Sequence, residues 1–259
     1  MFQEERMQAI SEYLTRHQRI DIKEICQRFE VSRDTARRDL LRMEELGLIL
    51  RTHGGAVLPP KGGVEVFEYK VRLERESSEK REIGLCAASL IKNGDHVLMD
   101  ASTTVQFAAE NITADDIVVV TNSIDIADVL SRKPAVRTYL LGGELHPKHR
   151  FLYGQATVDK LADYRVDKLF LGACGITAEG LTFPHEEDGV VKREMIKRAE
   201  QVIVLADHTK FDNRMFYRIA GLDAVDLLIT DRKPEADMLR LLEEHQVELI
   251  LVPEDDSDD

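Results

Sequence analysis

From residue 78 onward, short apolar runs alternate with segments in which apolar residues recur at helical spacing. The apolar runs are only four or five residues long, which fits strands better than helices. We therefore predict an α/β fold in which a mostly parallel sheet carries helices on both faces. The expected strands are His96–Met99, Ile117–Val120, Thr138–Leu141, Lys168–Leu171, Val202–Ala206, Leu227–Thr230 and Glu248–Val252, and the expected helices are Glu79–Ile91 (capped by Ser78), Thr103–Asn111, Asp125–Leu130, Val190–Ala199 and Glu235–His245.

The amino-terminal part of the chain has a different pattern, typical of short helices joined by tight turns. Apolar residues at helical spacing over 7–14 indicate a first helix. Asp21 and Glu24 then form a capping box ahead of a second helix, which buries Ile25 and Phe29. The three residues Glu30–Ser32 follow as a turn, so the pattern predicts a helix-turn-helix motif.

The third helix is expected over Arg33–Leu46, with Ser32 as its amino-terminal cap and Gly47 at its end. At about 100° per residue, one face of this helix is apolar and should pack on the first two helices. That face consists of Ala36, Leu40 and Met43. After the helix, Leu48–Ala56 is predicted to form a strand, a glycine turn and a returning strand, which is a wing.

Composition divides the chain further. Pro59–Gly63 disfavours helix, and the charged residues after it lead us to expect a linker over 59–77. The predicted organisation is a winged helix-turn-helix domain over 1–58, the linker, an α/β domain over 78–253 and an acidic tail over 254–259.

The net charge of the 259-residue chain is −13. Residues 1–58 contain ten Lys or Arg and ten Asp or Glu, so their net charge is zero and the −13 lies on the remainder. A generic polycation that coats nucleic acid is therefore excluded, and any basic surface must be local. Cys26, Cys86 and Cys174 are too far apart in sequence to suggest a disulfide framework or a zinc site, which fits a reducing cytoplasm. The sequence shows neither a signal peptide nor an apolar run long enough to span a membrane.

The exposed side of the third helix is rich in arginine. Arginine forks to guanine O6 and N7 or to phosphate, so this side is a candidate for contact with a DNA major groove. A solvated face is an alternative, because acidic residues on the same helix could pair with the arginines at i,i+4 spacing. These acidic residues are Asp34, Asp39, Glu44 and Glu45.

Two segments resemble the signature of the DeoR family of bacterial sugar-metabolism repressors: VSRDTARRDL (Val31–Leu40) and LRTHGGA (Leu50–Ala56). The resemblance covers nearly the whole chain. It implies a DNA-binding transcriptional regulator, with Ala36 where the family more often has Ile. The expected DNA contacts are Arg33, Thr35, Arg37, Arg38, Arg42, Arg51 and His53.

Small polar residues and glycines follow five of the predicted strands. In a parallel sheet these junctions share one edge, where ligands bind. One of them, Asp100–Thr104, opens a helix, and backbone NH groups at a helix start bind anions such as phosphate. Simple capping by Ser102 is the alternative. The other junctions are Thr121–Ser123, Gly142–Glu144, Gly172–Ile176 and Asp207–Phe211.

The family's sensor domain is related in fold to sugar-phosphate isomerases, so the resemblance implies a phosphorylated sugar as effector. It places Asp100 and Thr103 around the sugar or its phosphate, together with Ser102, where the family usually has Gly. Lys210 would be a cation facing the ligand, and Lys192 matches a common family lysine, although a surface lysine is equally compatible with the sequence. The full set of expected effector-binding residues is Asp100, Ser102, Thr103, Thr104, Gly142, Gly143, Gly172, Cys174, Gly175, Lys192, Asp207 and Lys210.

An isomerase is the main alternative function. Such an enzyme needs a carboxylate to move a proton, but the loop Gly172–Gly175 contains no acid. We expect Glu194 on a helix surface and Asp207 in a ligand or structural hydrogen bond, and the sequence lacks HExxH, P-loop and GxSxG motifs. The sequence therefore predicts a regulator without catalysis or cofactor, which binds double-stranded DNA as a homo-oligomer. An activator with the same architecture would share every residue named.

Overall fold

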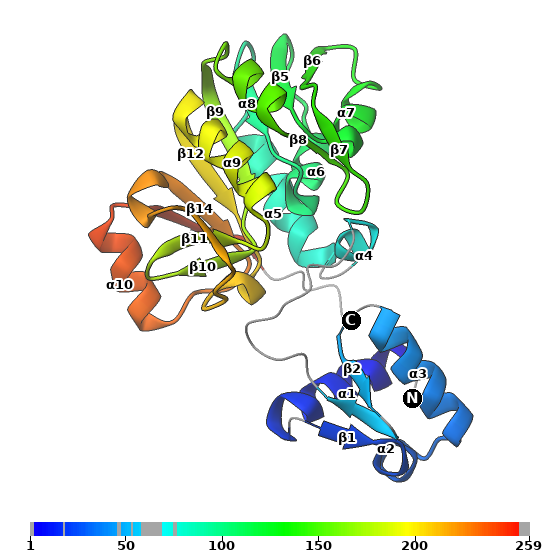
Figure 1. The fold of residues 1–259 in the computed structure, drawn as a ribbon. Coiled ribbons are helices and arrows are strands. Elements are labelled where there is room, and N and C mark those ends of the chain that lie inside the picture. The colour runs from blue at the N-terminus through cyan, green and yellow to red at the C-terminus, as the bar shows by residue number, and fades with distance from the viewer. Residues whose placement is uncertain are drawn as a thin grey trace. The chain divides into compact units, whose positions relative to one another are not determined.

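The computed structural model describes residues 3–17, 19–45, 48–52, 54–57, 69–74 and 77–253. They fall into two compact units, one within Met1–Phe67 and one within Glu68–Asp259 (Figure 1). Each unit has its own buried apolar core.

The first unit is a winged helix-turn-helix. Its antiparallel three-stranded sheet has the order β1-β3-β2, and β2 and β3 form the predicted wing. The strand β1, which pairs with β3, was not predicted, because three residues are too few to show a period. The elements are α1 (Gln3–His17), β1 (Arg19–Asp21), α2 (Ile22–Phe29), α3 (Arg33–Glu45), β2 (Leu50–Thr52) and β3 (Gly55–Val57).

Local signals fix the ends of these helices. The predicted capping box is confirmed: Asp21 accepts from the Glu24 amide at 2.8 Å, and the Asp21 amide donates to Glu24 at 3.0 Å. Ser32 accepts from the Thr35 amide at 3.1 Å, which starts α3 as expected. Gly47, the predicted end of α3, lies outside the described residues.

The second unit is built on a seven-stranded sheet in which every pair of neighbours is parallel. This confirms the predicted fold class. Each predicted strand is present, with ends that differ by at most three residues. In spatial order the strands are β15 (Glu248–Leu251), β14 (Leu227–Thr230), β12 (Ala199–Leu205), β9 (Val166–Gly172), β4 (His96–Met99), β5 (Ile117–Thr121) and β6 (Val136–Leu140).

Helices cover both faces of this sheet (Figure 1). Successive strand residues alternate between two apolar clusters, as the period of a strand requires; Leu98, for example, belongs to one cluster and Met99 to the other. One cluster contains α5 (Ser77–Ser89), α6 (Thr103–Glu110) and α7 (Ile124–Leu130), and the other contains α8 (Gln155–Leu161), α9 (Glu186–Arg198) and α10 (Ala236–Glu244).

Several short elements were not predicted. They belong to antiparallel pairings between segments of three or four residues, whose register is set by neighbours distant in sequence. A second sheet has the order β10-β11-β13, and a hairpin joins β7 to β8. Their bounds are β7 (Glu144–His146), β8 (Phe151–Tyr153), β10 (Gly175–Thr177), β11 (Gly180–Phe183) and β13 (Tyr217–Ala220), with short 3-10 helices η1 (His208–Lys210) and η2 (Leu222–Ala224).

The structure also differs from the prediction at the expected linker. Within residues 59–77 it places a helix, α4 (Tyr69–Glu74), whose Tyr69 is only 1% exposed. The Tyr69 hydroxyl donates to Gln106 Oε1 at 2.5 Å, so α4 packs on α6 and belongs to the second unit. This short helix is held by one buried aromatic residue, and it is too short to show a helical hydrophobic period in the sequence. Residues 58–68 and the expected acidic tail, 254–259, lie outside the described residues.

Candidate functional site

Helix α3 turns its apolar face inward and its arginines outward. Ala36, Leu40 and Met43 are at most 1% exposed and belong to the core of the first unit, as predicted. A buried ion pair reinforces this orientation: Arg6 Nε of α1 lies 2.6 Å from Asp39 Oδ2. The packing of the apolar face and this ion pair therefore determine which side of α3 points away from the core.

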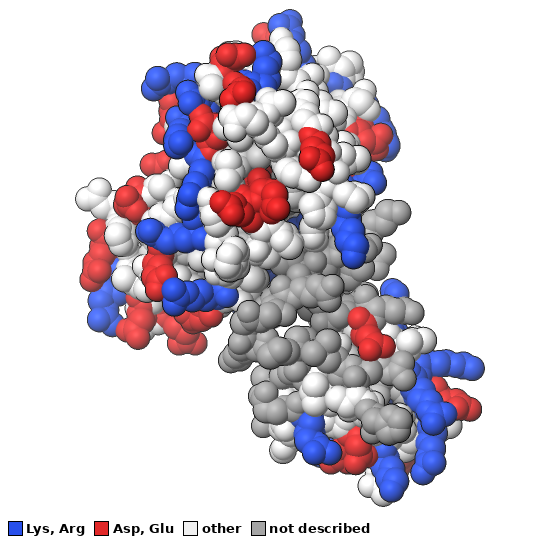
Figure 2. All heavy atoms as spheres, in the orientation of Figure 1, with Lys and Arg blue, Asp and Glu red and all other residues white. Residues whose placement is uncertain are grey.

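The arginines predicted to contact DNA gather on that outer face. Arg33, Arg37, Arg38 and Arg42 are exposed, and Figure 2 shows Lys and Arg side chains at the position of α3 with acidic ones between them. Arg37 and Asp34 approach to 3.9 Å, but both are more than 60% exposed, so this pair leaves Arg37 accessible. Thr35 is half-buried, with its hydroxyl 2.9 Å from that of Ser32.

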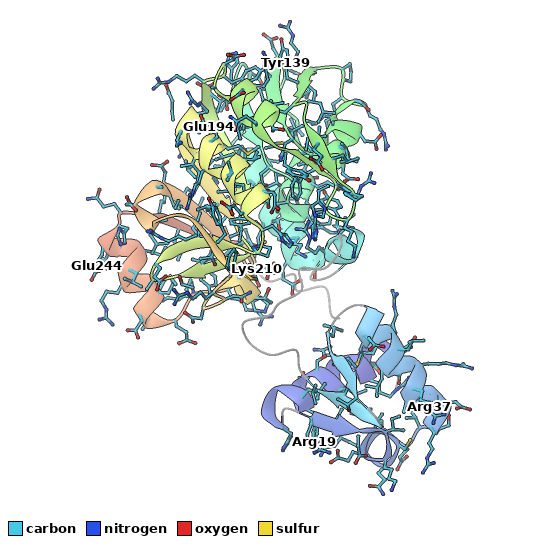
Figure 3. All side chains as sticks on the ribbon, in the orientation of Figure 1. Arg19, Arg37, Tyr139, Glu194, Lys210 and Glu244 are labelled. Carbon is cyan, nitrogen blue, oxygen red and sulfur yellow. The ribbon has the colours of Figure 1, made fainter. Side chains whose placement is uncertain are left out.

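The same unit has a hollow beside the wing that the sequence did not indicate. Basic residues of β1, α2 and α3 line it, together with residues of β3. Figure 3 labels Arg19 on β1 and Arg37 on α3. The basic residues are Arg19, Lys23, Arg33 and Arg37. Arg19 and Lys23 were missed because β1 and α2 approach α3 only in the folded unit. The Arg51 side chain and His53 lie outside the described residues.

The ligand-binding edge of the second unit is organised around the neighbouring strands β4 and β9. The chain runs from β4 outward through β5 to β6, and then from β9 outward through β12 and β14 to β15. The strand order reverses between β4 and β9, and such a switch point opens a crevice at the carboxyl ends of the strands. Asp100 follows β4 and Gly172 ends β9, so both lie at this switch point. The Gly172 amide donates to Asp100 Oδ1 at 3.1 Å.

Lys192 of α9 completes a buried charge cluster with Asp100. Its ammonium contacts Asp100 Oδ2 and lies 3.6 Å from Asp188 Oδ1. The Lys192 side chain is 4% exposed, so the alternative of a surface lysine is wrong. Burial by itself lowers the pKa of Lys192, but the two carboxylates outweigh it and raise that pKa. Burial raises the pKa of Asp188, a residue that the sequence did not indicate as part of the site.

The loop after β4 packs closely on β9. Thr103 and Thr104 are buried at the start of α6, and Ser102 is the capping residue. The Ser102 side chain makes no capping hydrogen bond, so the alternative that it serves only as a cap is wrong. Its Oγ lies 2.1 Å from the position that a Cβ on Gly172 would occupy, and glycine is therefore required there. The loop thus offers hydroxyls and helix-start amides beside Asp100.

Asp207 and Lys210, after β12, form a second pair of opposite charges. Asp207 is fully buried, and its Oδ2 lies 3.1 Å from Lys210 Nζ. Burial raises the pKa of Asp207, but the charge of Lys210 and other contacts, including the charge of Lys80, lower it overall. Lys80 of α5 is 4% exposed and donates to the Arg72 carbonyl at 2.7 Å. The sequence did not indicate a role for Lys80, because a lysine in the first turn of a helix is usually solvated.

The remaining predicted residues have structural roles in the described chain. The Gly142 carbonyl accepts from Thr157 Oγ1 at 2.7 Å, and Gly143 has φ +149°. A Cβ on Gly175 would lie 1.9 Å from the Asn213 carbonyl oxygen, so this glycine allows a close approach of two backbones. The Cys174 carbonyl accepts from Asn213 Nδ2 at 3.2 Å.

Glu194 is not on a helix surface as expected; the prediction is wrong. It is 8% exposed and accepts from Arg198 Nε at 2.7 Å and from Lys197 Nζ at 3.1 Å. These two cations lower its pKa against the effect of burial. In Figure 3 Glu194 lies well apart from Lys210. Its carboxylate is therefore engaged in a structural ion-pair cluster.

The fold and these two sites define a class: a DNA-binding regulator with a separate ligand-sensing domain. Residues 6–61 match the DeoR-like helix-turn-helix domain, and residues 75–232 match the DeoR C terminal sensor domain. The chain belongs to the DeoR family, and the resemblance found in the sequence is confirmed.

Known proteins show the same relationship over the full length. The chain is 51% identical over 259 residues to the HTH-type transcriptional repressor GlcR of Bacillus subtilis (strain 168), covering 100% of both chains. It is 32% identical over 254 residues to the glycerol-3-phosphate regulon repressor of Escherichia coli (strain K12), covering 97% of this chain and 100% of the other. Among solved structures, ribose 5-phosphate isomerase A of Methanocaldococcus jannaschii matches with TM-score 0.37 and 14% identity, over 52% of this chain and 54% of the other.

Two features are absent from the described residues. In that part of the chain, no helix combines the length and apolar character needed to cross a membrane. The same residues contain no group of three or more His, Cys, Asp or Glu side chains arranged to hold a metal ion.

Proposed function

We propose that this protein is a cytoplasmic transcriptional repressor of a carbohydrate catabolic operon, which binds operator DNA as a homo-oligomer and is released by a phosphorylated sugar. The observation that carries the proposal is the combination of an exposed arginine face on α3 with a loop of small hydroxyl residues that opens α6 at the switch point of the parallel sheet. Two relatives, GlcR and the glycerol-3-phosphate regulon repressor, are named as repressors, which supports the proposal.

The phosphate of the effector is proposed to bind the start of α6. Ser102, Thr103 and Thr104 supply hydroxyls and amides there. Lys210 and the buried Lys80 would contribute positive charge. Asp100 and Lys192, held rigidly against each other, would contact the sugar hydroxyls.

The DNA contacts are proposed for Arg33, Arg37, Arg38 and Arg42 of α3, with Arg19 and Lys23 beside the wing on phosphates. One recognition helix reads only a few base pairs, so paired or repeated half-sites on a homo-oligomer are needed for specificity. The zero net charge of residues 1–58 adds little nonspecific attraction.

The test uses a duplex selected from random sequences for binding to the full chain. Phosphorylated sugars are first screened by thermal shift, since a ligand of the native state raises the unfolding midpoint. An effector should then weaken DNA binding, and linkage requires that the DNA weaken sugar binding by the same factor, typically about 5- to 150-fold. If no phosphorylated sugar changes DNA affinity, the proposed effector class is excluded.

Lys210→Ala separates sensing from DNA binding. We expect weaker sugar binding through the lost charge, with DNA affinity in the absence of sugar unchanged. Lys233→Ala, an exposed lysine of the same unit, is the control and should leave both unchanged. Loss of DNA binding by folded Lys210→Ala would contradict the assignment of this residue to the sensor.

A further inference from the structure

Arg72 of α4 is an arginine inside the second unit that has no acidic partner among the described residues. Its guanidinium lies 5.4 Å from the centre of the Tyr69 ring, and its Nε is inaccessible to solvent without a hydrogen-bond acceptor. A buried donor without an acceptor is energetically costly, and more so when the group is charged. Its position is therefore unfavourable unless something supplies an acceptor.

A second orphaned group lies on the β7–β8 hairpin. His149 is 6% exposed, and its Nδ1 is buried without a hydrogen-bond partner. Its ring lies close to those of His146 and His185, with centroids 4.7 and 5.4 Å away and the ring planes tilted. Burial, reinforced by the charge of Arg72, lowers the pKa of His149 to about 3. The imidazole is thus neutral at physiological pH and can donate a hydrogen bond from one ring nitrogen.

The two orphaned groups belong to elements that are joined directly. The Tyr69 amide of α4 donates to the Lys148 carbonyl of the hairpin at 3.0 Å. Arg72 also acts on the switch-point cluster: burial raises the pKa of both Cys174 and Asp188, and the charge of Arg72 works against it at each. The charge of Arg72 therefore acts both on the hairpin, at His149, and on the switch-point cluster.

We propose that Arg72 and His149 form an oxyanion subsite, between α4 and the β7–β8 hairpin, for a second acidic group of the effector. This proposal rests on the proposed function, because it takes the effector as the ligand of the subsite. In the proposed function Lys210 and Lys80 already supply positive charge for the phosphate at Ser102–Thr104, so Arg72 is not needed for that first phosphate. A planar guanidinium with a free Nε–H suits a phosphate or carboxylate, and the neutral imidazole adds a hydrogen bond without a second charge.

Three hexose derivatives distinguish the ligand chemistries. Glucose 6-phosphate carries one anionic group, glucose 1,6-bisphosphate carries two phosphates, and 6-phosphogluconate carries a phosphate and a carboxylate. We expect at least one doubly anionic compound to bind the full chain about tenfold or more tightly than glucose 6-phosphate. Arg72→Gln should remove that advantage and leave the affinity for glucose 6-phosphate unchanged. Arg81→Gln is the matched control, because Arg81 is exposed and also lies over an aromatic ring, that of Phe107.

A direct readout on the wild-type chain makes the test independent of variant stability. The Arg72 Nε–H signal in a ¹⁵N-correlation spectrum, assigned by its loss in Arg72→Lys, should shift on addition of inorganic pyrophosphate or of the preferred doubly anionic sugar. No shift with pyrophosphate, glucose 1,6-bisphosphate or 6-phosphogluconate overturns the subsite, even if glucose 6-phosphate releases DNA. A shift without any effect of sugars on DNA affinity retains the subsite and rejects the proposed function instead.

Discussion

Arg6 of α1 donates two hydrogen bonds to Asp39 of the recognition helix α3, from Nε at 2.6 Å and from Nη2 at 3.1 Å. Both side chains are less than 10% exposed. Asp39 lies among the arginines in sequence, yet its carboxylate turns inward and fixes the helix to its neighbour. The acidic residue that the sequence suggested as a surface partner of arginine is therefore a structural one.

Removing Asp39 should unfold or severely destabilise the first unit. Asp39→Ala leaves Arg6 buried without its partner, and breaking a buried ion pair from one side costs about 3–5 kcal/mol. Asp34→Ala, on the same helix but 84% exposed, should change stability little. Urea unfolding followed by circular dichroism measures both. Equal stability of the two variants would contradict a structural role for the pair.

Loss of the exposed arginines should abolish DNA binding without unfolding. Arg38→Ala and Arg42→Ala remove contacts from the outer face of α3, where neither side chain supports the core. If a lost contact is to phosphate, the slope of log affinity against log salt should fall by about 1. Fluorescence anisotropy over a salt series measures this, with Arg132→Ala, 73% exposed just after α7, as the control. Unchanged affinity in both variants would remove this face from the interface.

The Lys192 cluster should be needed for the stability of the second unit. Lys192→Met leaves Asp100 and Asp188 buried without their cation, which we expect to cost about 3–5 kcal/mol. Adding Asp100→Asn should restore part of the loss, because the uncompensated charge is removed. Lys197→Met, 66% exposed on the same helix, should have a small effect. Denaturant unfolding is the measurement, and a small effect of Lys192→Met would show that the cluster is solvated.

His149 should make the second unit less stable in mild acid. Its pKa falls from the ordinary 6.5 to about 3 in the folded chain, chiefly through burial. The unfolded chain therefore binds more protons below pH 6.5, and stability decreases as the pH falls from 6.5 toward 3. Between pH 7 and pH 5 the titration of His149 lowers the free energy of unfolding by about 2 kcal/mol.

The difference between wild type and His149→Gln isolates this effect from that of other titrating groups. Unfolding at pH 7 and pH 5 should show a smaller acid loss in the variant. NMR titration of the imidazole should show no protonation of His149 between pH 7 and pH 5. Protonation near pH 6.5 would contradict the burial of this ring.

Local chemistry in the sequence was enough to predict the architecture. The capping box of Asp21 and Glu24, the inward face of α3 and the seven parallel strands all depend on residues within one turn or one strand of each other. For the same reason the loops after β4, β9 and β12 could be assigned to one edge of the sheet. Parallel strands must all end on the same side, whatever their spatial order.

Only the tertiary structure decided which charged groups are buried and which side chains they contact. The sequence could not show that Lys80, Lys192 and Glu194 are buried, because each lies on a helix whose other charges suggest a solvated face. Nor could it reveal that Arg72, in an expected linker, lies in the second unit beside the hairpin that carries His149. These contacts join segments up to 92 residues apart, as between Asp100 and Lys192. Their energies depend on the desolvation that packing imposes, and a sequence pattern carries no record of it.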